Sequence, residues 1–414
     1  MSKFNQQNLP LQTVESLNRI KVSKLMSLLE NHPYLENVEK AFNTKEIADE
    51  YINIDYVDSV FARIDQIIKS FKRFNVKAHI KDISLAEHLA EVDGITGTPI
   101  KFIFDDYVNE QGDVLNDLHA YAIHDAKNAF LNQYDMAKYA NRLYKDQHYA
   151  LVRYNIEHFK SLAAKSKKTD KLRSYRLLEH TGEVFLRGIT SIDQYNEYGV
   201  DFAFVTGILL FHSIMKSRPG DAYSISNAAI SISKLELIIT DKNLKEAKGF
   251  GKVSSTTIIS TNDLGNASFK LMNIVKVGIK DSRGFYVFPK AKRDYKNELI
   301  ITHNTKVNNA LTSLKVAHTI LRSSEEFIEE LESIKGISKP DELRARILFK
   351  LENSNSPFRK ITTIRDLFNP SITNSLDNFS KLLEMCRKAE ELDIDYDLKD
   401  KLRYIISDII LNKK

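Results

Sequence analysis

The chain has 414 residues, 43% of them hydrophobic, which is enough to bury a large core and to form two or three domains, or one core with helical additions. Its net charge of +5 is compatible with a nucleic-acid partner but does not require one. The first residues are polar, and the longest apolar runs, near 202–211 and 235–239, are far shorter than the roughly 20 residues of a membrane-spanning helix. We therefore expect a cytoplasmic protein with no membrane partner.

The first 94 residues are predicted to form a helical N-terminal region. Apolar residues recur at helical spacing most regularly between Val57 and Phe71. After Gly94 the period changes, because Ile100, Phe102 and Phe104 alternate as they do in a strand. A mixed core is therefore expected to begin near residue 95.

The rest of the chain is predicted to form an antiparallel-sheet core and then a helical C-terminal region. Helices are expected in 118–164 and 202–215, and strands in 174–189, with a hairpin turn at 180–182, and in 223–239 and 258–301. From residue 307 the pattern is helical to the end. The predicted fold class is α+β, with an antiparallel-sheet core at 95–306 between helical regions at 1–94 and 307–414.

The chain contains no complete catalytic motif. The run from Gly249 to Val253 lacks an upstream glycine and the Ser or Thr of a phosphate-binding loop. Asp221, Glu246 and Lys248 follow the order of a metal-dependent nuclease, but Glu246 lies in a polar stretch that predicts a turn. We expect no metal site and no cofactor, and an enzyme is the less favoured interpretation.

The cysteine and the histidines are predicted to be structural. Cys386 lies among leucines at helical spacing, as a buried thiol does. His119 and His124 are five residues apart, which on a helix separates them by about 140° and prevents shared metal ligation. His303, at the end of a predicted strand, is expected to be held by hydrogen bonds, and His212 to lie in the core.

Two basic stretches predict a surface for nucleic acid. The first leads into the hairpin near residue 174 and contains Lys165, Lys167, Lys168, Lys171 and Arg173. The second interleaves cations with aromatic residues and contains Lys276, Lys280, Arg283, Tyr286, Lys290, Lys292, Arg293 and Lys296. A single-strand site needs cations that neutralise phosphates and flat rings on which bases stack. The alternative for the second stretch is a solvated loop over core aromatics, since strand alternation turns one side inward.

Three motifs resemble those of a known group of proteins. They comprise Leu186, Arg187, Gly188, Ser191 and Tyr195, then Asn262, Asp263 and Gly265, and finally His303. In this order they resemble phage/plasmid-like proteins built on one domain of unknown function, over about residues 95–320. In those proteins a Cys-Asn-Gly element often precedes the histidine. This chain departs from the pattern, because it has Gly284-Phe285-Tyr286 near that point and no cysteine. The resemblance implies a setting in phage or plasmid DNA metabolism and brings no established activity.

We therefore expect a non-catalytic nucleic-acid-binding protein of phage or plasmid type. Single-stranded DNA is the favoured partner, in replication or recombination, with annealing as the specific version and a homo-oligomer as a possible assembly. The competing interpretation is a structural or host-interaction protein, such as a virion or anti-defence component, which contacts its partners through the helical ends. A metal-dependent nuclease is the third.

Overall fold

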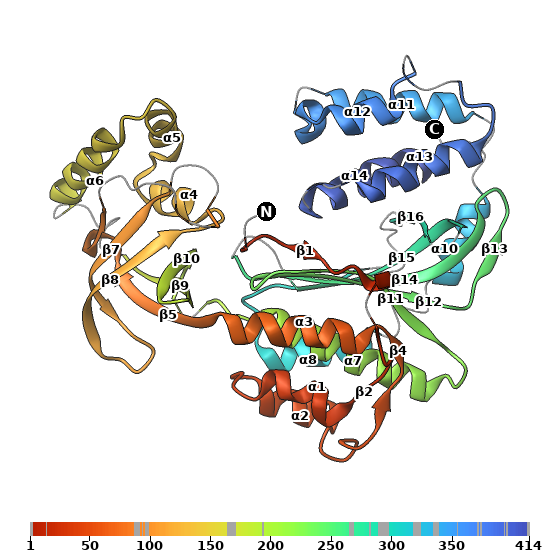
Figure 1. Ribbon diagram of the computed structural model, residues 1–414, viewed down its shortest axis with the longest axis horizontal. Coiled ribbons are helices and arrows are strands. Elements are labelled where there is room, and N and C mark those ends of the chain that lie inside the picture. Colours follow the sequence, from red (N-terminus) through yellow and green to blue (C-terminus); the bar gives the residue numbers. More distant parts are fainter. Residues whose placement is uncertain are drawn as a thin grey trace.

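The computed structural model describes residues 3–13, 15–86, 92, 94–95, 99–163, 171–192, 194–264, 269–280, 283–288, 298–317, 324–333, 339–353, 355–370, 372, 375–392, 394 and 396–411. These residues form a large central sheet with helices on both faces, and a smaller barrel beside it (Figure 1). Short 3-10 turns occur at Leu11–Thr13, Ser27–Leu29, Ile80–Asp82, Asn132–Tyr134 and Pro357–Lys360.

The large sheet is almost entirely antiparallel. Its main strands lie in the order β1 (Gln7–Asn8), β11 (Tyr223–Ile230), β12 (Lys234–Asp241), β14 (Gly251–Asn262), β15 (Phe269–Lys280) and β16 (Arg283–Val287). β13 (Lys245–Ala247) pairs with β14, β17 (Glu298–Ile301) with β15, and β4 (Ile54–Asp55) in parallel with β11. β2 (Ile20–Lys21) and β3 (Tyr51–Ile52) form a separate pair. The central strands are apolar on both sides because helices cover both faces of the sheet.

One face of the large sheet is covered by α7 (Gly199–Ser217), α3 (Val57–Ser70), α8 (Val307–Val316), α1 (Val22–Met26) and α2 (Leu35–Phe42), drawn below the sheet in Figure 1. Together they form the largest hydrophobic core of the described residues. By length and composition α7 is apolar enough to cross a membrane, and 83% of that apolar window is buried inside the protein. It is the central helix of this core.

The other face is covered by C-terminal helices, drawn above the sheet in Figure 1. They are α11 (Pro340–Glu352), α12 (Thr362–Phe368), α13 (Phe379–Glu391) and α14 (Tyr396–Leu411), and α10 (Ser324–Glu332) packs beside β13 and β15. Their apolar faces and the ends of β14 to β16 form a second core. Cys386 of α13 is fully buried in it, and burial raises the pKa of its thiol, so the predicted structural thiol is confirmed.

The remaining strands close into a barrel. They are β5 (Lys72–His79), β7 (Lys101–Val108), β8 (Val114–Ala122), β9 (Leu172–His180) and β10 (Glu183–Thr190), with β6 (Ile83–Leu85) at the edge. The ring runs β5-β7-β8-β10-β9 and back to β5, and every pair is antiparallel except β8 with β10. Between β8 and β9 the chain forms α4 (Ala126–Leu131), α5 (Ala137–Lys145) and α6 (Tyr149–Ala163), which pack on the barrel core.

The predicted α+β class is confirmed, whereas the prediction for the N-terminal region is wrong in part. Residues 72–79 and 83–85 were expected to be helical and are strands of the barrel. The helical pattern stops at Phe71, where α3 ends, and β5 turns Val76 and Ala78 into the barrel instead. The predicted boundary at residues 94 and 95 therefore falls inside the barrel, between β6 and β7.

Candidate functional site

The outer face of β7 and β8 carries rings and a cation. Phe102 and Phe104 point into the barrel, so their neighbours on β7 point outward. Lys101 pairs in register with Tyr121 of β8, and its Nζ lies 5.2 Å from the centroid of that ring. Further along, Ile103 lies opposite His119. Tyr121 is half-buried and packs against Phe185 of β10, with 6.0 Å between the ring centroids, at the margin of the large core. This end of the face therefore combines a partly covered ring with an apolar side chain and a positive charge.

The same face is acidic at its other end. Asp105 of β7 and Asp117 of β8 are both exposed, between the paired positions Phe104–Leu118 and Asp106–Asn116. His119 Nε2 lies 3.0 Å from Asp117 Oδ1, and Ser84 donates a hydrogen bond of 3.0 Å to Asp105. Lys160 of α6 lies 4.0 Å from Asp105 and offsets part of this negative charge. The end marked by Lys101 is the more favourable one for a polyanion.

Helices α4 to α6, which adjoin that end, are basic. Residues 126–162 contain three acids, Asp135, Asp146 and Glu157, and six cations, Lys127, Lys138, Arg142, Lys145, Arg153 and Lys160. Several apolar side chains of α5 and α6 are also exposed, among them Tyr139, Leu151, Tyr154, Phe159 and Leu162. Cations interleaved with exposed rings are what a single-stranded nucleic acid requires.

A cavity of about 650 Å³ lies between this helical layer and the barrel. We call it the barrel cavity. One wall is formed by Leu85, Pro99 and Lys101 at β6 and the start of β7, and the other by Tyr144 to Arg153 at the end of α5 and the start of α6. Lys101 thus belongs both to the cavity and to the outer face of β7, which makes the two surfaces continuous.

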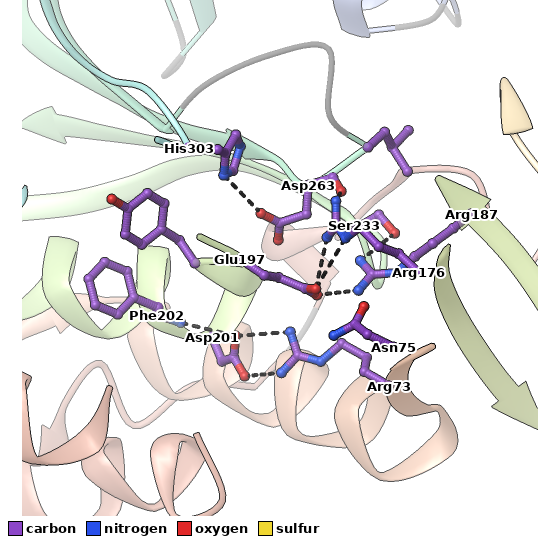
Figure 2. Close-up of polar contacts among 12 residues, drawn as sticks. Arg73, Asn75, Arg176, Arg187, Glu197, Asp201, Phe202, Ser233, Asp263 and His303 are labelled. Atoms are coloured by element: carbon purple, nitrogen blue, oxygen red, sulfur yellow. Dashed lines mark hydrogen bonds and ion pairs between the residues drawn. The ribbon is translucent and has the colours of Figure 1, made fainter. Parts of the chain in front are cut away.

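A buried set of charges connects the barrel to the rest of the protein (Figure 2). We call this set, Arg73, Arg176, Arg187, Glu197, Asp201 and Asp263, the ion-pair cluster. Its three arginines come from the barrel strands β5, β9 and β10. Its carboxylates come from the segment before α7, the first turn of α7 and the end of β14. The cluster is formed where the two parts of the protein meet.

Glu197 is the central carboxylate of the ion-pair cluster. It pairs with Arg187 and, at 2.9 Å, with Arg176, both of which are almost completely buried. Burial alone would raise the pKa of Glu197, but the arginines hold it far below its usual range. Arg187 also donates to Ser233 at 3.4 Å, and Arg176 to the main-chain oxygen of Asp263.

Asp263 lies beside His303 at the opposite side of the ion-pair cluster. Burial, and then the nearby charge of Glu197, raise the pKa of Asp263. Among the described residues neither of its carboxylate oxygens has a hydrogen-bond partner, and Oδ1 lies 3.8 Å from His303 Nδ1. The two imidazole nitrogens of His303 lie 2.8 and 3.1 Å from the main-chain oxygens of Asn196 and Asn262.

The residues selected by the resemblance come together here. Tyr195 stacks on His303 with ring centroids 4.4 Å apart. The guanidinium of Arg176 lies over the Tyr195 ring, 4.4 Å from its centroid. Arg187 and Asp263 belong to the ion-pair cluster itself. His303 is held by hydrogen bonds at both nitrogens, as the sequence predicts.

A second cavity, of about 610 Å³, opens beside the ion-pair cluster, and we call it the junction cavity. Arg73 and Asn75 of β5 line it together with the start of α7. Its wall carries five carboxylates, those of Glu30, Asp65, Glu110, Glu197 and Asp201, against the two cations Lys69 and Arg73. This balance disfavours a polyanion.

Two residues of the second predicted basic stretch lie in the interior. Lys276 is 6% exposed and Tyr286 is 7% exposed, and Arg403 of α14 lies over the Tyr286 ring at 5.2 Å. Burial raises the pKa of Tyr286 to about 12 and lowers that of Lys276 to about 8. The C-terminal helices thus cover both side chains, and neither can contact a nucleic acid on this surface.

The remaining predicted contacts are only partly described. Lys280 and Arg283 pair in register where β15 meets β16. Lys171 is exposed and Arg173 half-buried at the start of β9. Lys165, Lys167, Lys168, Lys290, Lys292, Arg293 and Lys296 lie outside the described residues, as does Gly265. These seven cations stay predictions.

The structure changes the predicted positions of His119 and His124 and keeps that of His212. His119 lies in β8 and His124 in the turn after it, with φ of 53°, so they are not on one helix. His212 is a core histidine, as expected, with Nε2 2.8 Å from Glu50. Within the described parts of the chain, no group of three or more His, Cys, Asp or Glu side chains could hold a metal ion.

The sequence interpretation missed Lys101 and Arg153. Both lie in segments that were assigned to a strand and a helix without any role in binding. A signal was present in 126–162, where exposed-type tyrosines alternate with lysines and arginines in the same way as in the stretches that were selected.

Comparison with known proteins adds no relative. No protein-family profile, no curated protein and no solved structure matches this chain. The resemblance to phage/plasmid-like proteins therefore stays a prediction.

Proposed function

We propose that this protein binds single-stranded nucleic acid, with DNA favoured, through its barrel. The observation that carries the proposal is the connectivity. With the short edge strand β6 left out and the other five numbered along the chain, the barrel strands close in the order 1-2-3-5-4-1, with helices between the third and the fourth. This is the connectivity of the OB-fold, a barrel that binds oligonucleotides or oligosaccharides across its second and third strands. The argument from connectivity is one of fold analogy, and the surface has to support it.

The second and third strands here are β7 and β8. Their outer face carries Tyr121 and Ile103, and the ammonium of Lys101 lies beside the tyrosine ring. Base stacking on an exposed ring contributes about 1–3 kcal/mol per base. Tyr121 is half-buried, so we assign most of the stacking to the exposed rings of Tyr139 and Tyr154 on α5 and α6. The acids Asp105 and Asp117 make the far end less favourable, although Lys160 of α6 lies beside Asp105, so we place the strand from Lys101 toward the exposed cations of α5 and the start of α6.

The biological setting follows from the resemblance and not from the surface. A single-strand binder of phage or plasmid type would act in replication or recombination, and annealing is the specific version that we propose. A homo-oligomer would place several barrels along one strand and raise affinity through effective concentration.

The test is binding of single-stranded and duplex oligonucleotides across a salt series. We expect Lys138→Ala with Arg142→Ala and Lys145→Ala, all exposed on α5, to flatten the salt slope by up to about two units, from about 0.7 per phosphate contact. The matched control removes three exposed lysines of the C-terminal region, Lys350, Lys360 and Lys388, and should leave the slope unchanged. Equal slopes for the two triple variants would remove the barrel from the binding surface, and no binding by the unaltered protein would refute the proposal.

One observation favours a second function, that of an interaction protein. The outer side of α6 exposes Tyr154 by 66%, Leu162 by 49% and Leu151 by 43%, at spacings that place them on one side of the helix. Exposed apolar side chains of this kind mark protein contacts. Loss of self-association in a Tyr154→Ser, Leu162→Ser variant that still binds oligonucleotides would assign this side of α6 to a protein contact.

A further inference from the structure

The barrel cavity has the charge that an anion requires. Its lining contains Lys101, Arg153 and His148 and, among the described residues, no aspartate or glutamate. The junction cavity is of similar volume and carries five carboxylates. An anionic ligand is therefore favoured in the barrel cavity and disfavoured in the junction cavity.

The two cations of the barrel cavity come from opposite walls. Lys101 begins β7, and Arg153 lies in the second turn of α6. An anionic group bound in the cavity would therefore be contacted by a cation from each wall, as a phosphate is when two basic side chains neutralise it. A volume of about 650 Å³ falls within the range of roughly 300–1,000 Å³ that small-molecule sites occupy.

The helical wall adds two aromatic rings. The centroids of Tyr144 and Tyr149 are 5.5 Å apart, with the rings inclined by 48°. Lys127 lies over the Tyr144 ring at 4.1 Å, and burial raises the pKa of Tyr144 to about 12, which keeps its phenol neutral. Tyr149, which is half-buried, also lines the cavity, beside the polar side chains of Gln147 and His148.

We infer that the barrel cavity binds one nucleotide of a bound strand, with its phosphate between Lys101 and Arg153 and its base against Tyr149. The inference rests on the proposed function and extends it from contact with the backbone to capture of an unstacked nucleotide. A duplex keeps its bases in the stack, so such a site selects single strands. Gln147 and His148 line the same cavity, and we assign their polar groups to the edge of the base.

The experiment uses the full chain with thymidine 5′-monophosphate as probe, thymidine and inorganic phosphate as comparisons, and calorimetry or amide chemical shifts as readout. We expect the nucleotide to bind at least tenfold more tightly than either comparison and to compete with a labelled oligonucleotide. Lys101→Ala and Arg153→Ala should each weaken the nucleotide at least tenfold. Lys72→Ala, which removes an exposed lysine from β5, is the matched control.

A second variant tests the cavity without removing a charge. Ala150 is exposed and lines the cavity near the start of α6, so Ala150→Trp should fill the space, leave the melting temperature unchanged and abolish nucleotide binding. Two results together would overturn the inference: the unaltered protein binds no mononucleotide, and the Ala150→Trp variant still binds oligonucleotides. The proposed function would then stand. Phosphate binding as tightly as the nucleotide would also overturn it, because the base would then contribute nothing. Failure to bind any oligonucleotide would instead refute the proposed function.

Discussion

Arg73, in the first strand of the barrel, pairs with Asp201, in the first turn of the central helix α7 (Figure 2). The two residues are 128 positions apart in the chain, and the Asp201 side chain is only 2% exposed. Burial alone would lower the pKa of Arg73, but Asp201 and then Glu197 raise it well above its usual value. The ion pair therefore fixes the barrel to the large core.

The first prediction concerns the coupling across this contact. Arg73→Met or Asp201→Leu alone should lower the free energy of unfolding by about 3 kcal/mol, since each leaves a buried charge without its partner. The double variant should lose much less than the sum, because it leaves neither charge behind. Urea denaturation of the four proteins measures the coupling. Effects that add within about 0.5 kcal/mol would show that the two residues are energetically independent.

The second prediction concerns Gly199, two residues before Asp201. Its φ is +77°, and a Cβ atom there would lie 2.1 Å from Asp201 Oδ1. Gly199→Ala should therefore combine backbone strain with displacement of the ion pair and cost about 2–4 kcal/mol. Gly220, with φ of +109° and open space around it, isolates the strain, and Gly220→Ala should cost about 1 kcal/mol. Equal losses in thermal denaturation would show that the contact with Asp201 is unimportant.

The large sheet and α7 could be predicted because their signals are local and long. β14 and β15 each run for 12 residues, and α7 for 19. In the barrel, β7 and the β9–β10 hairpin were predicted as strands, whereas β5, β6 and β8 were not, because their signals are weak. β5 follows α3 after a single residue, and β8 is exposed over most of its first half, so its sequence lacks the apolar alternation that marks a strand.

The ion-pair cluster was accessible only through the resemblance. Its motifs contain Arg187, Tyr195, Asp263 and His303, which the fold does bring together. Arg73 and Glu197 belong to no motif, and pairing between residues so far apart leaves no local pattern to recognise. The predicted nucleic-acid surface included Lys276 and Tyr286, which are buried. Sequence alone does not show that the C-terminal helices, which lie far along the chain, cover these two side chains.

The third prediction is a loss of stability in acid that depends on His124. Burial, and then the charges of Lys234 and Arg187, lower the pKa of His124 to about 4. Between pH 6.5 and about 4 the unfolded chain therefore binds more protons at this position than the folded one, and stability falls as the pH falls through that window. The loss is at most about 3 kcal/mol, at about 1.4 kcal/mol per pKa unit.

The variant His124→Gln removes this loss because glutamine does not titrate. Urea midpoints at pH 7, 5.5 and 4.5 should decline less steeply in the variant than in the unaltered protein. His158→Gln, at an exposed position on α6, is the matched control and should follow the unaltered protein. A His124→Gln curve parallel to that of the unaltered protein would assign the acid loss to other groups.

The last prediction separates the covered lysine of the large sheet from the surface that we propose for nucleic acid. Burial lowers the pKa of Lys276 to about 8, so its ammonium is a cost to the folded state at pH 7. Between about pH 8 and 10.5 the unfolded chain binds more protons there, and this cost disappears as the pH rises. Lys276→Met keeps the length of the side chain without the charge. The variant should be more stable than the unaltered protein at pH 7, by up to about 3 kcal/mol, and this difference should be smaller at pH 9.5.

The oligonucleotide affinity of the Lys276→Met variant should be unchanged, because the side chain is 6% exposed beneath the C-terminal helices. A salt slope flattened by about 0.7 units in this variant would make Lys276 a phosphate contact, and would require those helices to move aside when the strand binds.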